Sequence, residues 1–206
     1  MIYLCRHGET DWNREGRYQG RLESRLTELG EAQARALADA LERETVARVI
    51  TSPLRRCVGT AQPFAERRGL AIETDPDLTE IAHGVWEGRL RSEIERDDSE
   101  TMRAWRAHPQ TVHFEGGESL AGVAARWRAF THRIGDADDL LIVTHDVVVR
   151  IAILAAAGRP PAELWQPRVV NAGYALFRDA ASWELLRECV DDHLGALRVD
   201  TTTQAL

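Results

Sequence analysis

The chain has 206 residues, of which 44% are hydrophobic and 29% are charged, the balance of an ordinary globular protein rather than of a disordered or fibrous chain. That length suits one domain with a sizeable core better than two. The 26 basic and 33 acidic residues give a formal net charge of −7, which argues against nucleic acid or an anionic membrane surface as a partner.

Every basic residue apart from histidine is an arginine, because the sequence contains no lysine. Any bound anion must therefore be held by guanidinium groups. The cysteines, Cys5, Cys57 and Cys189, are odd in number and widely spaced, which indicates free thiols in a reducing compartment. The apolar runs at 2–5 and 151–157 are too short for an export signal or a membrane span. We therefore predict a cytoplasmic protein that binds no membrane.

In chain order, short runs typical of β-strands alternate with longer helical patterns. The predicted strands are Ile2–Cys5, Val46–Thr51, Leu140–Thr144 and Tyr174–Phe177. Thr27 can cap a first long helix. Pro53 suits the first helical position of a second one, which Pro63 should kink or end early.

Two more helices are predicted, one over an apolar face that begins at Leu120 and one directly after His145. Residues 88–117 are polar and irregular, with a short helical patch at 102–105, and they indicate an insertion rather than a second domain. The alternation of strands and helices predicts one α/β domain over residues 1–206 with a largely parallel sheet. We expect an antiparallel addition at 174–187 and a loose C-terminal tail from about residue 195.

Groups that can bind or attack a phosphate follow three of the predicted strands. Arg6 and His7 follow the first, Arg56 lies just beyond the second, and His145 follows the later one. Because the carboxyl ends of parallel strands share one edge of a sheet, these side chains can meet in one pocket. This pocket is the local positive site that an acidic protein needs to bind an anion.

The segment RHGETDWN at 6–13 resembles the signature of the histidine phosphatase superfamily, also called phosphoglycerate mutase-like. Further matching motifs occur in the family's order, and they are YQG at 18–20, LTELG at 26–30, TSPLRRCVGTA at 51–61, LTEIAHGVWEG at 78–88, GGES at 116–119 and VTHDVVVR at 143–150. The resemblance covers about residues 1–177. It implies a three-layer α/β/α sandwich with a mostly parallel central sheet and helices on both faces.

The resemblance also implies an activity. It indicates a phosphomonoesterase that needs neither metal nor cofactor and hydrolyses a small phosphorylated metabolite through a phosphohistidine. His7 would be the nucleophile, and nearby guanidinium groups would lower its pKa and keep it neutral. A ring nitrogen donating to a backbone carbonyl would aim the other nitrogen, and Gly8 would let the backbone approach the ring closely.

The remaining roles follow from the same motifs. The resemblance assigns phosphate binding to Arg6, Arg56, Asn13 and His145, and His145 is also a catalytic residue. Glu80 would protonate the leaving alcohol and later take a proton from water. Arg56 rather than Arg55 lies four residues after Ser52, as the pattern requires, so we expect Arg55 to face solvent. Contacts to the rest of the substrate are expected from Gln19, Gly20 and Arg21.

The sequence departs from the family pattern at a few positions. Asp146 stands where the family usually has glycine, and beside a bound phosphate its charge would be repulsive. We predict that its side chain turns away to cap the following helix or to bind a substrate hydroxyl. Glu23, Arg25 and His83 also differ from the common residues, with an expected effect on loop shape, and His83 is interpreted as a surface or packing residue.

Three alternatives stay open. His7 and His145 with Glu80 or Asp146 could form a metal site, but the neighbouring arginines argue against a divalent cation there. Phosphoglycerate mutase-type transfer is disfavoured because only 64 residues separate Glu80 from His145. A non-catalytic phosphate-binding module would retain the fold without turnover. The pattern names no particular phosphoester, and the protein can be a monomer or a homodimer.

Overall fold

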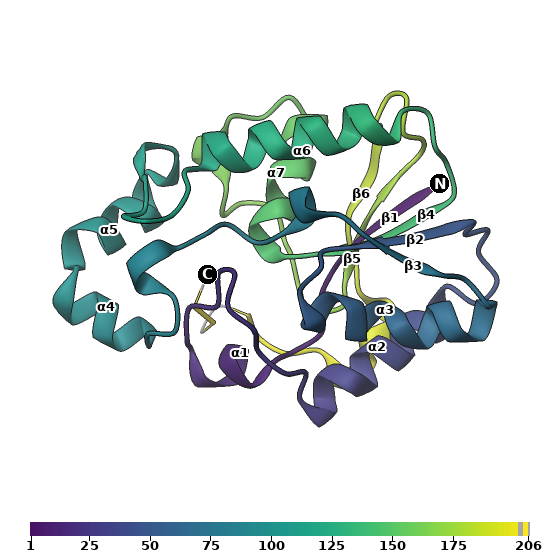
Figure 1. The fold of residues 1–206 in the computed structure, drawn as a ribbon, viewed down its shortest axis with the longest axis horizontal. Coiled ribbons are helices and arrows are strands. Elements are labelled where there is room, and N and C mark those ends of the chain that lie inside the picture. Colours follow the sequence, from purple (N-terminus) through teal and green to yellow (C-terminus); the bar gives the residue numbers. More distant parts are fainter. Residues whose placement is uncertain (202–203, 206) are drawn as a thin grey trace.

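A six-stranded sheet forms the middle of the protein, whose computed structural model describes residues 1–201 and 204–205 (Figure 1). The strands lie in the order β3-β2-β4-β1-β5-β6. Their bounds are β1 Ile2–Arg6, β2 Arg48–Thr51, β3 Ile72–Thr74, β4 Leu140–Thr144, β5 Tyr174–Phe177 and β6 Leu185–Val190. The first four pair in parallel, whereas β5 and β6 add antiparallel strands on one side, as predicted for 174–187.

Both faces of the sheet are buried, which makes the fold a three-layer α/β/α sandwich. Successive side chains of a strand point to opposite faces, so Ile2 and Leu4 of β1 enter one apolar cluster while Tyr3 and Cys5 enter another. Helices α6 and α7 cover the first face, and α2 and α3 cover the second (Figure 1). The predicted architecture is confirmed.

The helices begin where the sequence offers caps. The Thr27 hydroxyl accepts a hydrogen bond from the Gly30 amide, and the Ser119 hydroxyl accepts one from Gly122, which satisfies amides at the starts of α2 and α6. The helix bounds are α1 Asp11–Glu15, α2 Glu28–Ala40, α3 Arg55–Arg68, α4 Arg91–Asp97, α5 Ser99–Ala107, α6 Leu120–Ile134 and α7 Asp146–Ala156.

Helix α3 differs from its prediction at both ends. It begins at Arg55 rather than Pro53, and it continues through Pro63 to Arg68. Proline removes one intrahelical hydrogen bond, yet Ala61 and Phe64 on either side of it are buried against the sheet. Tertiary packing therefore outweighs the local penalty, and the expected early end is wrong.

Residues 88–117 fold into helices α4 and α5 and the short 3₁₀ turn Pro109–Thr111, and they bury Trp105 and Phe114 in the main core. The other 3₁₀ turns are Pro76–Leu78, Gly84–Trp86, Pro161–Glu163 and Asp192–Leu197. Leu194 in the last of these is buried, and the loose tail predicted from about residue 195 stays a prediction, since residues 202, 203 and 206 of it lie outside the described part of the chain. None of the helices in residues 1–201 is long and apolar enough to cross a membrane.

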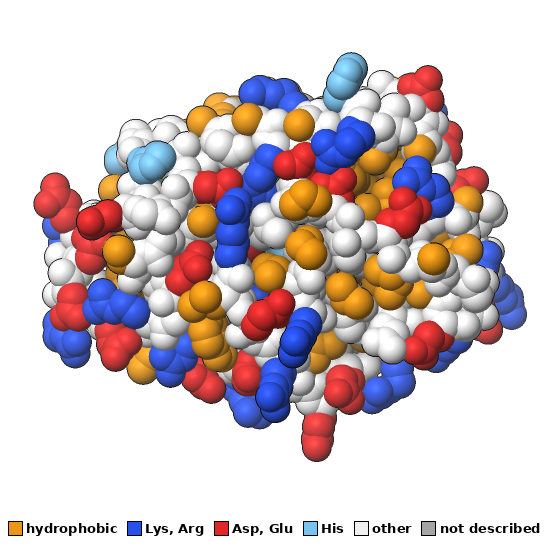
Figure 2. Space-filling view, viewed as in Figure 1, with side chains coloured by type: hydrophobic (Ala, Val, Ile, Leu, Met, Phe, Trp, Pro, Cys, Tyr) orange, Lys and Arg blue, Asp and Glu red, His pale blue; other side chains and the backbone are white. Residues whose placement is uncertain are grey.

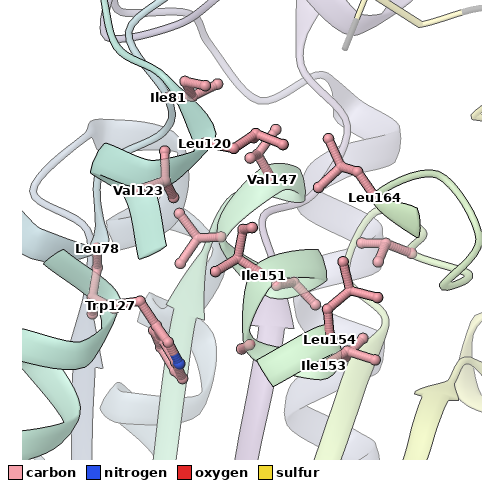
Figure 3. Packing of buried hydrophobic residues seen from close by; sticks show 14 of the residues in the cluster. Leu78, Ile81, Leu120, Val123, Trp127, Val147, Ile151, Ile153, Leu154 and Leu164 are labelled. Carbon is pink, nitrogen blue, oxygen red and sulfur yellow. The ribbon is translucent and has the colours of Figure 1, made fainter. Parts of the chain in front are cut away.

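Helix α7 is the most deeply buried helix next to the strand ends. Every residue from Asp146 to Leu154 is buried, and Figure 3 shows Val147 and Ile151 packed toward Leu120 and Val123 of α6. This packing fixes the first turn of α7 at the end of β4. The side chains that precede and begin the helix therefore have little freedom to move.

Candidate active site

The carboxyl ends of β1, β2 and β4 bring the predicted chemical groups together. The His7 amide donates to the Thr144 carbonyl at 2.9 Å, and the Ser52 amide donates to the Val143 carbonyl at 3.0 Å. These bonds extend the parallel ladder by one residue beyond the strands. The backbone itself thus holds His7, Ser52 and His145 at one edge of the sheet.

His7 is a buried, neutral imidazole with a defined tautomer. Its Nδ1 lies 2.7 Å from the Gly8 carbonyl, which can only accept, so Nδ1 carries the proton and Nε2 keeps its lone pair. Burial, and then the charges of Arg56 and Arg6, lower the pKa of His7 well below its usual value. The predicted orientation of the ring is confirmed.

Gly8 is needed for a reason beyond the one predicted. A Cβ on Gly8 would lie 2.7 Å from the Gly30 carbonyl oxygen, so the glycine also makes room for the start of α2. The Gly8 amide donates to the Thr60 hydroxyl of α3 at 2.9 Å. The loop after β1 therefore contacts both α2 and α3.

Arg6 is a buried guanidinium group, and two of its nitrogens make no hydrogen bond within the described residues. Its Nη2 donates to the side-chain oxygen of Gln204, and its Nη1 lies 3.3 Å from Asp146 Oδ1. Within the described residues, neither its Nε nor its Nη1 makes a hydrogen bond. A buried N–H without an acceptor is costly, so these two nitrogens mark a place for an anionic oxygen.

Arg56 closes the pocket from the side of α3. Its Nη1 and Nη2 donate to the carbonyls of Leu22 and Gly20 at 2.8 and 2.7 Å, and its Nε donates to His145 Nδ1 at 3.3 Å. Each terminal nitrogen keeps a second N–H. Arg55 is exposed, as predicted, and burial lowers the pKa of Arg56.

His145 lies behind the cavity rather than in its wall. Because Arg56 can only donate to its Nδ1, the proton sits on Nε2, which is 2.8 Å from the Ser52 hydroxyl. The ring centroid is 5.2 Å from that of His7. Burial and the charge of Arg56 lower the pKa of His145 well below its usual value, so the second histidine is also neutral.

Glu80 lines the same cavity and has an unusual carboxyl group. Its Oε1 accepts from its neighbour, the Ile81 amide, at 2.9 Å, and its Oε2 accepts from the Val147 amide at 3.5 Å. Burial, and next the negative charge of Asp146, raise the pKa of Glu80 to about 7. The group is therefore poised to give and take a proton near neutral pH.

Asn13 lies beside Arg6 but points its amide at the C-terminal segment. Its Nδ2 donates to Gln204 Oε1 at 3.1 Å, the same oxygen that Arg6 contacts. The Gln204 amide in turn donates to Asn171 Oδ1 at 2.8 Å. The Gln204 oxygen thus occupies the position where two donors that were predicted to bind phosphate, on Arg6 and Asn13, converge.

The cavity itself is almost full. Its free volume is about 10 Å³, roughly the room that one water molecule needs. It is lined by seven predicted residues, Arg6, His7, Asn13, Gln19, Gly20, Arg56 and Glu80, and by three that were not predicted as site residues, His83, Val147 and Ala205. Gln204 also borders a second cavity of about 380 Å³, whose wall includes Tyr18, Trp105 and Trp165.

The predicted substrate contacts divide into two groups. Gln19 and Gly20 reach the cavity, and because Gly20 has no Cβ the Glu87 carboxylate can pass close to it. Arg21 does not reach the cavity. It is half exposed and pairs with Glu118 at 2.9 Å, so the structure does not support direct contact between Arg21 and a substrate in this pocket.

Asp146 does not turn away from the site as predicted. Its side chain does not cap α7; it lies buried between two guanidinium groups, 3.3 Å from Arg6 Nη1 and 2.5 Å from Arg150 Nε. A carboxylate with two cationic partners is more stable here than one at the helix end, because the interior offers no water to solvate the arginines. Its charge is fully paired.

His83 is a buried polar residue, so of its two predicted interpretations, surface or packing, the packing one is confirmed. It is only 2% exposed, and among the described residues neither of its ring nitrogens has a hydrogen-bond partner. Its ring packs edge-on against Tyr18 and Phe114, and burial lowers its pKa to about 3. Its position inside the matching motif at 78–88 was the available signal, whereas nothing in the sequence pointed to Gln204 or Ala205.

The arrangement suits an anion better than a metal ion. Within residues 1–201 and 204–205, no three histidine, cysteine, aspartate or glutamate side chains are grouped as a metal site requires. The Cys57 thiol, 3.4 Å from His145 Nε2, has its pKa raised by burial and so stays protonated. Buried guanidinium donors facing a neutral imidazole are groups that phosphoryl transfer uses.

Comparison with known proteins gives a consistent answer. The sequence model of the histidine phosphatase superfamily (branch 1) matches residues 2–188. Phosphoserine phosphatase 1 of Hydrogenobacter thermophilus is 34% identical over 203 residues, which cover 97% of this chain and 96% of that protein. Glucosyl-3-phosphoglycerate phosphatase of Mycobacterium tuberculosis is 34% identical over 175 residues, covering 80% and 78%.

The fold has matches among solved structures as well. Bacillus stearothermophilus YhfR superimposes with a TM-score of 0.88 at 31% identity, over 94% of this chain and 98% of that one. The sheet order and helix layers described above are thus those of a known structural group.

Proposed function

Because the chain belongs to the histidine phosphatase superfamily (branch 1), we propose that it hydrolyses a small phosphorylated metabolite through a phosphohistidine formed on His7. The protein is a phosphoric monoester hydrolase, because it belongs to this family and the sequence relatives named above are phosphatases. The observation that carries the assignment of roles is the buried Arg6 guanidinium, whose Nε and Nη1 make no hydrogen bond within the described residues, beside the neutral His7, whose Nε2 keeps its lone pair. No metal and no cofactor takes part in the proposed chemistry.

In the first step, His7 Nε2 attacks the phosphorus atom. A P–N bond forms, and the bond between phosphorus and the alcohol oxygen breaks. The protonated Glu80 carboxyl, whose pKa is raised to about 7, gives its proton to the departing oxygen. Arg6 and Arg56 hold the equatorial phosphoryl oxygens, where negative charge is spread in the transition state.

In the second step, water attacks the phosphohistidine. Glu80, now a carboxylate, takes a proton from the water as its oxygen bonds to phosphorus, and the P–N bond breaks. The products are inorganic phosphate and the original neutral His7. His145 positions Arg56 from behind, through the hydrogen bond that Arg56 Nε donates to His145 Nδ1.

Substrate entry requires the C-terminal segment to move. The cavity is too small for a phosphoryl group while the Gln204 oxygen lies between Arg6 and Asn13. A phosphate oxygen can replace this amide oxygen on the same donors and bring more negative charge. Gln204 is therefore a competitor that the substrate displaces.

The His7→Ala variant tests the proposal, with His132→Ala as the control because His132 is an exposed residue of α6. We expect His7→Ala to lose at least about 10⁴-fold in turnover of 4-nitrophenyl phosphate in the presence of a chelator. It should also lose the acid-labile phosphoenzyme seen in quenched reactions, while its circular dichroism stays unchanged. Appreciable turnover by His7→Ala overturns the mechanism.

The two alternatives have tests of their own. If 3-phosphoglycerate isomerises when a bisphosphate primer is present, the protein is a mutase. Absence of turnover with any ester of a phosphometabolite panel, together with phosphate binding, would assign a non-catalytic module. The cytoplasmic location, which fits the three free thiols in the structure, stays a prediction, as does the choice between monomer and homodimer.

A further inference from the structure

The Asp146 carboxylate is the centre of a buried ionic group. Its Oδ1 lies 3.3 Å from Arg6 Nη1, and its Oδ2 lies 2.5 Å from Arg150 Nε. The Asp146 and Arg6 side chains are each 1% exposed and that of Arg150 is 7% exposed. Arg150 also donates to the carbonyls of Leu164 and Pro167, which fixes it in place. The Asp146 carboxylate is thus held beside the guanidinium that we assign to the phosphate.

Asp146 also lies next to the proposed acid. Glu80 accepts a hydrogen bond from the amide of Val147, the residue directly after Asp146. The other charged groups around Glu80 are arginines from three elements, Arg6 of β1, Arg56 of α3 and Arg126 of α6. Arg126 is itself paired with Glu118 at 3.2 Å, and the imidazoles of the site are neutral.

The two carboxyl groups differ in their partners. Asp146 has two guanidinium groups, whereas Glu80 accepts only from backbone amides in the described part of the chain. When two carboxyl groups lie close together in a buried site, the better-paired one keeps the charge and the other keeps the proton. The charge on Asp146 and the proton on Glu80 are therefore linked.

We propose, on the basis of the phosphatase function above, that Asp146 is a positioning residue that acts through Glu80 and Arg6. Its buried charge keeps the Glu80 carboxyl protonated for departure of the leaving group. The same charge offsets that of Arg6, so that the product phosphate is held weakly and leaves. Nothing in the family resemblance assigns this role, because the family usually has a residue without a side chain at this position.

The charge-removing variant is Asp146→Asn, and Asp146→Glu is its charge-conserving partner. The assay follows kcat/KM against pH with phenyl phosphate, whose leaving group needs a proton. In Asp146→Asn the basic limb should move down by roughly one pH unit, because Glu80 ionises more easily without a neighbouring negative charge. Asp146→Glu should keep the wild-type profile.

Inorganic phosphate reports the second effect. Its Kd, measured by calorimetry at pH 5, where Glu80 is protonated, should fall by about tenfold in Asp146→Asn because Arg6 no longer shares its charge. Glu163→Gln, which removes a charge from a surface ion pair with Arg159, should change neither the profile nor the Kd. Both measurements respond to the charge of residue 146. A purely structural role of Asp146 would not lower both the basic limb and the Kd of phosphate.

The proposal fails if Asp146→Asn shows the wild-type basic limb and phosphate affinity, or if Asp146→Glu shifts as far as Asp146→Asn. Should Asp146→Asn not fold, Asp146→Gly leaves space for water beside Arg6 and is expected to change both readouts in the same direction. A wild-type protein without turnover or phosphohistidine refutes the phosphatase function instead. In that case the calorimetric Kd still decides the effect of Asp146 on Arg6.

Discussion

The floor and the roof of the active site are built in different ways. The floor, which we define as Arg6, His7, Ser52 and His145, lies on strands or directly after them, and backbone hydrogen bonds of the sheet hold it in place. The roof, defined as residues 19–22 and 204–205, is held by guanidinium donors, from Arg56 of α3 and from Arg6 of the floor. Arg56 binds the carbonyls of residues 20 and 22, and Arg6 binds Gln204.

Because of this difference, the groups that react lie in one region and the groups that limit access of the substrate lie in another. Groups that react must stay within a fraction of an ångström of their productive positions, and a parallel ladder provides that rigidity. The roof uses the same guanidinium donors to which we assign phosphate binding, so in the proposed mechanism substrate binding and roof contacts exclude each other at Arg6. Variants of floor residues should therefore change kcat strongly, whereas variants of roof residues should mainly change KM.

The largest effect after loss of His7 is expected for Glu80→Gln. Wild-type kcat/KM for phenyl phosphate should fall as the pH rises above about 7, since the protonated carboxyl is then lost. Glu80→Gln removes that basic limb and lowers turnover by about 10³-fold. With 4-nitrophenyl phosphate, whose leaving group needs no proton, a burst of one equivalent should survive before slow hydrolysis. A burst with neither ester would show that Glu80 does more than move a proton.

Arg6→Lys tests the rigidity of the floor itself. Lysine keeps the positive charge but replaces the planar fork by one ammonium group, so it cannot serve Asp146 and two phosphoryl oxygens together. We expect kcat to fall by about 10²-fold while the fold persists. The matched control is Arg55→Lys, one residue before Arg56 and exposed, which should leave kcat unchanged. Equal effects of the two changes would contradict the assignment.

A smaller effect of the opposite sign is expected for Gln204→Ala in the roof. Removing the amide oxygen frees donors on Arg6 and Asn13 without touching the floor. The Kd of inorganic phosphate should fall by about three- to tenfold, because one displaced hydrogen bond to a charged group no longer competes. Calorimetry measures this directly. A weaker phosphate affinity in Gln204→Ala would show that the glutamine assists binding instead.

The smallest change should come from Arg21→Ala. Arg21 pairs with Glu118 at the surface and does not line the cavity, and exposed ion pairs contribute about 0–1 kcal/mol. We expect less than about a twofold change in KM for 4-nitrophenyl phosphate. A larger rise in KM would mean that the loop reorients when substrate binds and would restore the original prediction for Arg21.

The floor could be predicted from the sequence because its information is local. The strands at 140–144 and 174–177 match their predictions residue for residue, and the motifs that end β1, β2 and β4 sit where the sheet topology brings them together. Strand β3, in contrast, has only three residues, none of them buried, so it carries no apolar pattern to recognise. The prediction that Pro63 ends its helix early was wrong for a different reason, because tertiary packing rather than local preference determines where α3 ends.

The roof could not be predicted, because its contacts join residues far apart in the sequence. Gln204 and Arg6 are separated by 198 positions, and no periodicity links an amide near the C-terminus to a strand at the start. Arg21 and Asp146 show the same limit. Their motifs placed them near the site correctly, but the direction of each side chain depends on partners, Glu118 and Arg150, that only the folded chain brings close.

The position of Gln204 has a practical consequence for handling the protein. A purification tag fused after residue 206 would begin three positions beyond Gln204, whose side-chain oxygen accepts a hydrogen bond from Arg6, and we expect its charge and bulk to affect phosphate binding. The Met1 amino group, in contrast, lies at the opposite end of β1, paired with Asp139 on the surface. Tags, dyes and surface attachments therefore belong on the N-terminus when affinities are to be compared.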